Sequence, residues 1–140
     1  MSGADSALRR IPIAEEDDIV AARQSARELA KALGFRAIDQ TRITTAVSEL
    51  ARNVVRYATD GRGEVTLRPL DVAGGGVGIE IVVRDEGPGI ADVDLALREG
   101  YTSGRGLGMG LPGTRRLMDE MAIDSAPGRG TTVTIRKWRR

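Results

Sequence analysis

The sequence predicts an α+β protein, a single layered domain spanning residues 1–140. Apolar residues recur at helical spacing in two segments between residues 15 and 58, whereas strand-like alternation dominates the second half of the chain. One further helix follows a glycine-rich stretch late in the sequence. The predicted order of elements, with helices first and then strands with one late helix between them, indicates a layered α+β sandwich. A chain of 140 residues has the size of one ordinary domain, and no repeat or linker divides it.

The first part of the chain predicts a short strand and two helices. Residues 8–13 are typical of an edge strand, because Pro12 has no N–H to donate to a ladder. The acidic run Glu15–Asp18 favours a helix start, and Gly34 favours its end. A second helix is expected over about 39–58, with an apolar stripe at intervals of three and four residues.

The second part predicts mainly strands. The most β-rich run, residues 79–84, has the composition of a central strand. The other expected elements are a strand over 64–70, a short helix over 92–99, a helix from the glycine-rich stretch up to Met121, and strands over 122–125 and 131–138.

Composition excludes several kinds of chemistry. The chain has no cysteine and no histidine, so it can form no disulfide, no Cys- or His-ligated metal site, no Ser-His-Asp triad and no phosphohistidine. The net charge of +1 and the four aromatic residues argue against a nucleic-acid partner. No apolar run approaches membrane-spanning length and no signal-peptide core is present, so we expect a cytoplasmic protein without a membrane partner.

The glycine-rich stretch Gly104–Gly113 indicates an anion site. Glycines let backbone N–H groups approach a bound group closely, and the helix start that follows adds unpaired donors. An ordinary glycine loop explains the same letters equally well. Gly108–Gly113 also matches the dinucleotide fingerprint G-x-G-x-x-G, but it does not follow the first strand of a βαβ unit. A Walker P-loop is excluded because no Gly-Lys-Ser/Thr follows the glycines.

Polar residues elsewhere complete a possible nucleotide site. A buried carboxylate at Asp85 can accept a hydrogen bond from the amine of adenine. Gly87 and Gly89 would let the base lie against the backbone, and the hydroxyl of Thr131 could add a polar contact. Arg105 is available for the charge of the phosphates.

Two residues on the second helix add reaction chemistry. Asn53 offers a hard oxygen ligand for Mg²⁺, and Glu49, one turn earlier on the same face, can accept a proton from an attacking hydroxyl or water. An isolated Glu-xxx-Asn pair is more often a solvated helix flank, so this prediction depends on the whole set of residues.

Four segments resemble the motifs of the GHKL ATPase superfamily. They are Glu49-Leu-Ala-Arg-Asn53, Asp85-Glu-Gly-Pro-Gly89, Gly106-Leu-Gly-Met-Gly110 and Gly130-Thr-Thr132, similar to the N, G1 and G2 boxes and the terminal threonine motif. The resemblance implies a Bergerat fold, a two-layer α/β sandwich with a mixed, mainly antiparallel sheet. The implied roles are adenine binding by Asp85, magnesium binding by Asn53, phosphate binding by Gly106, Gly108 and Gly110, and catalytic base for Glu49.

The absent histidine and the short segment available for an ATP lid separate the chain from histidine kinases. What remains is the group of single-domain serine kinases of bacterial partner-switching systems. Asp18–Gln24, Asp39–Asn53, Leu111–Glu120 and Lys137-Trp138 resemble the stressosome switch kinases of that group. The related anti-sigma factor kinases usually carry His-Ala-Tyr after the N box, where this chain has Arg56-Tyr-Ala58.

This resemblance implies an enzyme that uses Mg²⁺ and ATP to phosphorylate Ser or Thr of STAS-domain proteins. Released from them, such a kinase binds and activates a PP2C-type phosphatase. Two alternatives stay open: a nucleotide-dependent anti-sigma factor or regulatory binding module with little kinase activity, and an ATPase that transfers phosphate to water.

Overall fold

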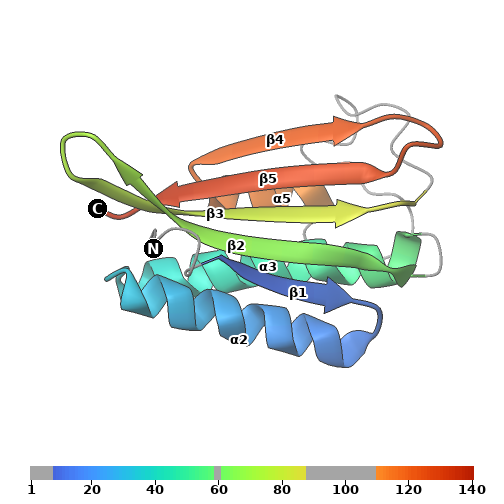
Figure 1. Ribbon diagram of the computed structural model, residues 1–140, viewed down its shortest axis with the longest axis horizontal. Helices are drawn as coiled ribbons and strands as arrows, with labels where there is room; N and C mark the ends of the chain where they lie inside the picture. Colours follow the sequence, from blue (N-terminus) through green and yellow to red (C-terminus); the bar gives the residue numbers. More distant parts are fainter. Residues whose placement is uncertain (1–7, 59–60, 88–109) are drawn as a thin grey trace.

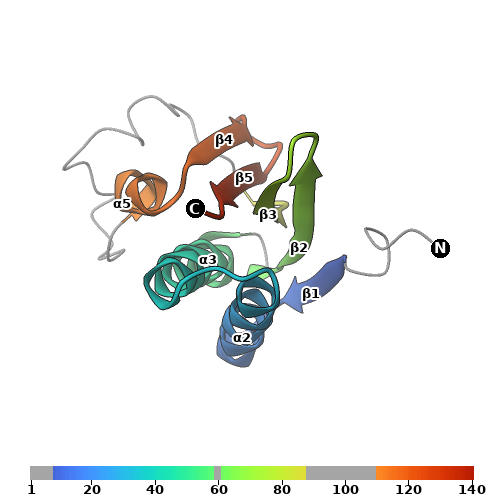
Figure 2. The same cartoon turned by 90° about the vertical axis from the view of Figure 1, so that its left-hand side faces the viewer.

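The computed structural model describes residues 8–58, 61–87 and 110–140. A sheet forms one layer, and helices lying against one of its faces form the second (Figures 1 and 2). The elements in chain order are β1 Arg9–Ile13, α2 Glu16–Ala32, α3 Ala37–Tyr57, β2 Gly63–Val72, β3 Gly76–Asp85, α5 Gly110–Leu117, β4 Glu120–Ser125 and β5 Thr131–Trp138. The predicted α+β class and two-layer architecture are confirmed.

The first helix begins and ends where the sequence predicts. The carboxylate of Asp18 accepts hydrogen bonds from the backbone N–H groups of Ala14 and Glu15, at 2.8 and 3.0 Å. These bonds hold the chain at the helix start, where donors lack intrahelical partners. At the other end, Gly34 takes φ +87°, a left-handed conformation that a residue with a Cβ rarely adopts.

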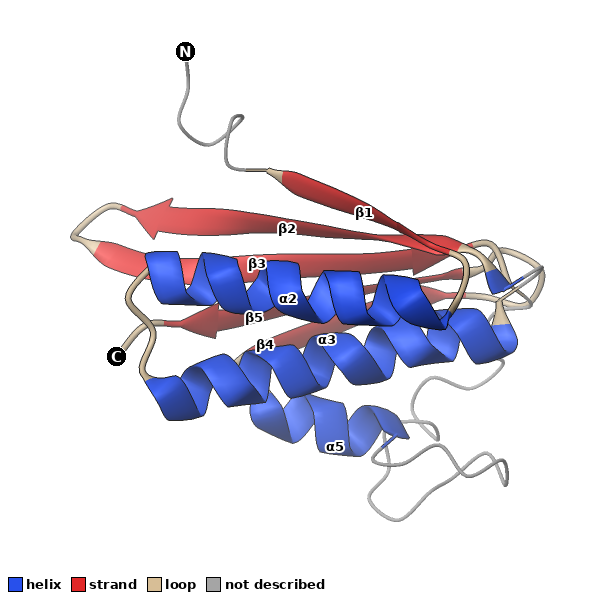
Figure 3. Ribbon diagram, turned by 90° about the horizontal axis from the view of Figure 1, so that it is seen from below, coloured by secondary structure: helices blue, strands red, loops and turns tan. Residues whose placement is uncertain are grey.

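The second helix, α3, lies between α2 and α5 on the sheet (Figure 3). Ile43, Val47, Leu50 and Val54 of its predicted stripe are all buried. Because these residues face the sheet, the orientation of α3 is fixed. Glu49 and Asn53, at the flank of the stripe, are therefore held at defined positions on the helix.

The strands are ordered β1-β2-β3-β5-β4, so β3 is central and β1 is at an edge, both as predicted. Every pairing among the described strands is antiparallel, whereas the family resemblance implied a mixed sheet. Tight turns join β2 to β3 and β4 to β5, and such hairpins can produce only antiparallel neighbours.

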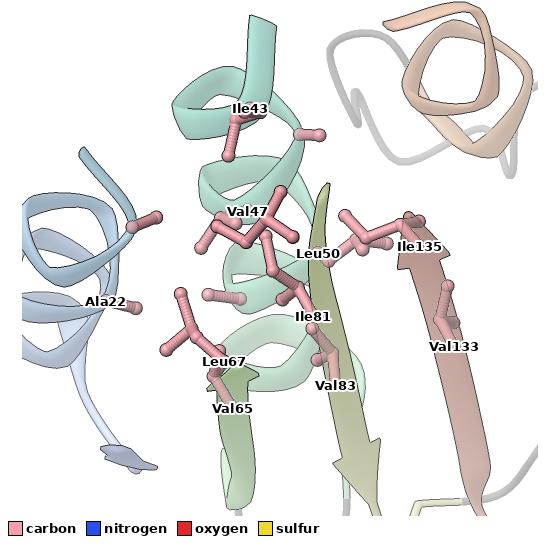
Figure 4. Close-up of a cluster of buried hydrophobic side chains, with 14 of the residues drawn as sticks. Ala22, Ile43, Val47, Leu50, Val65, Leu67, Ile81, Val83, Val133 and Ile135 are labelled. Atoms are coloured by element: carbon pink, nitrogen blue, oxygen red, sulfur yellow. The ribbon is translucent and has the colours of Figure 1, made fainter. Parts of the chain in front are cut away.

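The core fills the space between the two layers. Side chains of α3 meet alternate residues of the strands, including Val65 and Leu67 of β2 and Ile81 and Val83 of β3 (Figure 4). The predicted alternation over 64–70 is confirmed, since Val65 and Leu67 are buried while Arg68 is exposed. Fully burying each such aliphatic side chain stabilises the fold by about 1.5–3 kcal/mol.

The late helix is shorter than predicted. It ends at Leu117, and Met121 lies in β4 opposite Ile135 of β5. The N–H of Asp119 donates to the carbonyl oxygen of Arg136 at 3.0 Å, so pairing with β5 replaces helix continuation. The helix predicted over 92–99 lies outside the described residues. In the described part of the chain, no helix is long and apolar enough to cross a membrane.

Candidate active site

Glu49 and Asn53 lie one turn apart on α3, as predicted. The side chain of Glu49 is 15% exposed, and its Oε1 accepts a hydrogen bond from Nη1 of Arg52 at 2.8 Å. This ion pair holds the carboxylate close to the helix surface. Arg52 was not among the predicted site residues, although its position three residues after Glu49 within one motif is a recognisable helical pairing signal.

Asn53 carries an unusual polar atom. Its Oδ1 is buried and has no hydrogen-bond partner among the residues that the structure describes. A buried acceptor without a partner costs about 1–3 kcal/mol. An amide oxygen is a suitable ligand for Mg²⁺, so the donor set and its unused acceptor fit a metal ion at this residue.

Asp85 ends β3, and its side chain is oriented by the turn that follows. Oδ1 of Asp85 accepts the N–H of Gly87 at 2.8 Å, which leaves Oδ2 as an acceptor for another group. Asp85 is half-buried, less than the buried carboxylate that the sequence predicted, because it lies where the strand leaves the sheet.

The end of α3 packs closely on this turn. A Cβ added to Gly87 would lie 2.8 Å from Cα of Ala58 and 3.2 Å from the carbonyl oxygen of Tyr57. Glycine is therefore required here for helix–turn packing. This close approach places the helix that carries Asn53 next to the strand end that carries Asp85.

Thr131 begins β5 directly opposite Asp85 in the strand register. Its Oγ1 lies 2.8 Å from Oγ of Ser125, which is its opposite residue on β4. Ser125 is a second residue that the sequence analysis missed. No local pattern singles it out, because only the register of β4 against β5 brings it to Thr131.

Gly110 begins α5 with φ +65°, and its carbonyl oxygen accepts a hydrogen bond from Oγ1 of Thr114 at 3.0 Å. At the far end of the helix, Asp119 accepts the N–H of Trp138 at 2.8 Å and an ion pair from Arg140. Burial raises the pKa of Asp119. The hydrogen bonds and positive charge of these partners outweigh burial, so the pKa of Asp119 lies below its usual value. The helix that follows the glycine stretch is thus anchored to β5.

Glu49 and Asn53 lie on α3, whose end packs on the turn at Gly87, and Asp85 and Thr131 are paired at the strand ends beside that turn. Gly110 lies at the start of α5, which runs alongside α3 (Figure 3). The remaining predicted site residues, Gly89, Arg105, Gly106 and Gly108, lie outside the described residues.

The helix–sheet sandwich and these motif residues define a class of protein. The family model of the histidine kinase-like ATPase domain matches residues 13–137, and the chain belongs to this family. That family is the GHKL group which the motifs resembled, so the resemblance is confirmed.

Within the family, one relative is similar over almost its whole length. The chain is 47% identical to the serine/threonine-protein kinase RsbT of Bacillus subtilis, over 93% of this chain and 96% of that protein. It is also 33% identical to the anti-sigma F factor of a Thermoanaerobacter species, over 69% of this chain and 68% of that protein.

Solved structures show the same fold. The RsbU and RsbW domains of Rv1364c from Mycobacterium tuberculosis superpose with a TM-score of 0.61 at 22% identity, covering 95% of this chain. This chain spans only 33% of that longer protein. The mycobacterial sensor histidine kinase MprB gives a TM-score of 0.56 at 18% identity, covering 94% of this chain and 97% of that structure.

Proposed function

We propose that this chain is a serine/threonine-protein kinase of the RsbT type in a bacterial partner-switching module. The observation that carries the proposal is the 47% identity to RsbT, which extends over 93% of the chain. Similarity confined to a nucleotide-binding motif would support only a shared fold, whereas similarity over 93% of the chain extends well beyond that motif and supports a shared activity.

The proposed reaction transfers the γ-phosphoryl group of ATP to a Ser or Thr hydroxyl. The new bond joins the acceptor oxygen to phosphorus, the bond to the β-phosphate oxygen breaks, and ADP leaves. Glu49 accepts the proton of the hydroxyl, and Asp85 binds the adenine amine. Asn53 would hold Mg²⁺ beside the phosphates, where the ion would neutralise the negative charge that develops during transfer. The phosphates are bound by Arg105, Gly106, Gly108 and Gly110.

We propose STAS-domain proteins, of the RsbS and RsbR kind, as the substrates. Release from the phosphorylated protein frees the kinase to activate a PP2C-type phosphatase of the RsbU kind. These partners follow from the similarity to RsbT and from the proposed hydroxyl acceptor.

A second candidate is supported by the anti-sigma F factor relatives at 33–36% identity. In that function, the chain is a nucleotide-dependent binding module or anti-sigma factor with little kinase activity. Arg56-Tyr-Ala58 after the N box favours the switch kinase over this second candidate.

Intact-mass spectrometry of a STAS-domain protein incubated with this chain and Mg-ATP tests the proposal. We expect a single phosphate adduct with the native chain and none with Glu49→Gln, which removes the proton acceptor but keeps the side-chain shape. Glu28→Gln is the matched control, because Glu28 is an exposed carboxylate on α2 whose side chain is 71% exposed.

Each alternative has its own outcome in this experiment. Nucleotide binding without any adduct would support the binding module. Free phosphate that forms at the same rate with and without the STAS protein would indicate an ATPase. Full transfer by Glu49→Gln would remove Glu49 from the role of base.

A further inference from the structure

Four residues form a row across the end of the sheet. Gly63, Asp85, Thr131 and Ser125 are directly opposite one another in the register of β2, β3, β5 and β4. Residues two positions along the same strands, such as Val83 and Val133, are buried against the helices. Because side chains alternate between faces, the row lies on the helix face of the sheet.

The hydroxyl groups in this row can be oriented by counting hydrogens. Oγ of Ser125 donates to the carbonyl oxygen of Gly130 at 3.0 Å and lies 2.8 Å from Oγ1 of Thr131. A carbonyl oxygen can only accept, and a serine hydroxyl has a single hydrogen. Both bonds form together only if Thr131 donates its own hydrogen to Ser125.

This arrangement determines which groups in the row donate hydrogen bonds and which accept them. With its hydrogen committed to Ser125, Thr131 offers only lone pairs to any group beyond it. Its neighbour Asp85 also offers an acceptor, because Oδ1 already takes the N–H of Gly87 and a carboxylate has no hydrogen to donate. The middle of the row therefore presents acceptors alone.

We propose that Ser125 is a specificity-determining positioning residue for the nucleotide base. By holding Thr131 as an acceptor, it makes the row complementary to a 6-amino purine, which donates, and unfavourable to a 6-oxo purine, which accepts there. This inference rests on the proposed function in one respect, that the base binds at Asp85. Ser125 bonds to Thr131 and to the backbone of Gly130, and we infer that it acts on the base through its bond to Thr131.

Titration calorimetry with ADP and inosine diphosphate tests the inference without relying on catalysis. The two probes share the ribose and phosphates, whereas inosine carries an oxo group at position 6 and a hydrogen on N1. In Ser125→Ala, the Thr131 hydroxyl is free to turn and donate to the oxo group. We expect the ratio of the two dissociation constants, which favours ADP in the native chain, to fall about three- to tenfold.

Three variants separate orientation from general damage. Ser125→Thr keeps a hydroxyl and should restore the native ratio. Thr131→Val removes the oriented group, so adding Ser125→Ala to it should change the ratio no further. Ser48→Ala is the matched control, since Oγ of buried Ser48 donates to the carbonyl oxygen of Thr44 at 2.8 Å on α3, away from the row.

The possible outcomes are distinguishable. Equal weakening of ADP and inosine diphosphate by Ser125→Ala, or an unchanged ratio, overturns the inference and leaves the proposed kinase standing. A further fall in the ratio on adding Ser125→Ala to Thr131→Val also overturns it. A native chain that binds neither nucleotide overturns the proposed function as well.

Discussion

Asn53 shows how a single residue can be better explained by a ligand than by the fold. Among the described residues, its Oδ1 is the one buried side-chain nitrogen or oxygen atom that has no hydrogen-bond partner. Gln40 on the same helix, by contrast, donates from Nε2 to the carbonyl oxygen of Phe35 at 2.9 Å. A fold that leaves one buried acceptor unpaired carries a cost that a bound cation would offset.

Replacing Asn53 should therefore separate stability from function. We expect Asn53→Ala to be as stable as the native chain or up to about 1 kcal/mol more stable, because an unsatisfied acceptor is removed. Its affinity for ADP in Mg²⁺ should fall about tenfold or more, with little change in EDTA. Urea unfolding and calorimetry measure the two effects.

Gln40→Ala is the control for a paired amide on α3 and should lose stability without losing magnesium dependence. An Asn53→Ala variant that binds Mg-ADP normally would contradict the assignment of Asn53 to the metal.

The β4–β5 hairpin places Thr131 beside Ser125. Two glycines of this hairpin differ in how much space surrounds them. Gly128 and Gly130 both have positive φ, at +77° and +74°. An added Cβ at Gly128 would meet nothing within 4 Å, whereas one at Gly130 would overlap the carbonyl oxygen of Asp85. Gly130 is therefore needed for close approach as well as for backbone conformation.

Alanine substitutions should reveal this difference. Gly128→Ala should lower the free energy of unfolding by about 1–2 kcal/mol, the cost of a left-handed alanine. Gly130→Ala should lower it by clearly more and should also weaken ADP binding, because β3 and β5 must move apart at Asp85. Equal losses of stability and normal ADP binding in both variants would contradict this account.

The open face of the sheet is held by a charged network centred on β3. Oε1 and Oε2 of Glu80 accept hydrogen bonds from Nε of Arg68 and Nε of Arg136, each at 2.7 Å. Burial raises the pKa of Glu80, but the hydrogen bonds and charges of the two arginines outweigh it and lower the pKa below its usual value. The network ties together three neighbouring strands.

The lowered pKa of Glu80 predicts how the free energy of unfolding depends on pH. The folded-state pKa of Glu80 is lowered, so its contribution is complete above the unfolded value of about 4.3 and is lost as pH falls through the folded value. We expect Glu80→Gln to cost about 1–2 kcal/mol at pH 7, discounted for the half-exposed arginines. The difference from the native chain should shrink below about pH 4 in urea unfolding.

Glu64→Gln provides the comparison for an ordinary surface pair. Glu64 lies 3.6 Å from Nε of Arg10, and both side chains are solvent-accessible. Its loss should cost less than about 1 kcal/mol at any pH. A Glu80→Gln cost that is constant from neutral to acid pH would contradict the network argument.

For the molecule as a whole, the last strand connects elements that are distant in sequence. Nζ of Lys137 on β5 donates to the carbonyl oxygen of Leu117 at the end of α5, at 3.0 Å, and lies 3.9 Å from Oδ1 of Asp39 near the start of α3. Lys137 and Asp39 are both buried. The two helices beside the candidate site thus share one buried cation.

Removing this cation should destabilise the whole fold. We expect Lys137→Met to lower the free energy of unfolding by about 1–3 kcal/mol, because a charge-assisted hydrogen bond is lost from the interior. Arg139→Met is the matched control: Nη1 of Arg139 donates to the carbonyl oxygen of Leu33 at 2.9 Å, but at the exposed surface. Its cost should stay below about 1 kcal/mol in the same urea titration. Equal costs would contradict a special role for the buried ammonium.

Local patterns in the sequence were sufficient for the fold class, most helix and strand positions, and the placement of Glu49 and Asn53 one turn apart on one helix. Periods of 3.6 and 2 residues depend on neighbours along the chain, so they can be read without a fold. The same patterns misplaced the end of α5, because the pairing of Asp119 and Glu120 with Arg136 depends on β5, which is distant along the chain.

Only the tertiary structure could place Ser125 beside Thr131, Arg68 and Arg136 on Glu80, and Lys137 between two helices. Each of these contacts joins residues on different elements, and strand register decides which residues meet. A shift of one residue in the register would turn every side chain of a strand to the other face. The chemical roles of the residues could therefore be predicted from the sequence. Their partners could not, because these depend on strand register and on the packing of the sheet against the helices.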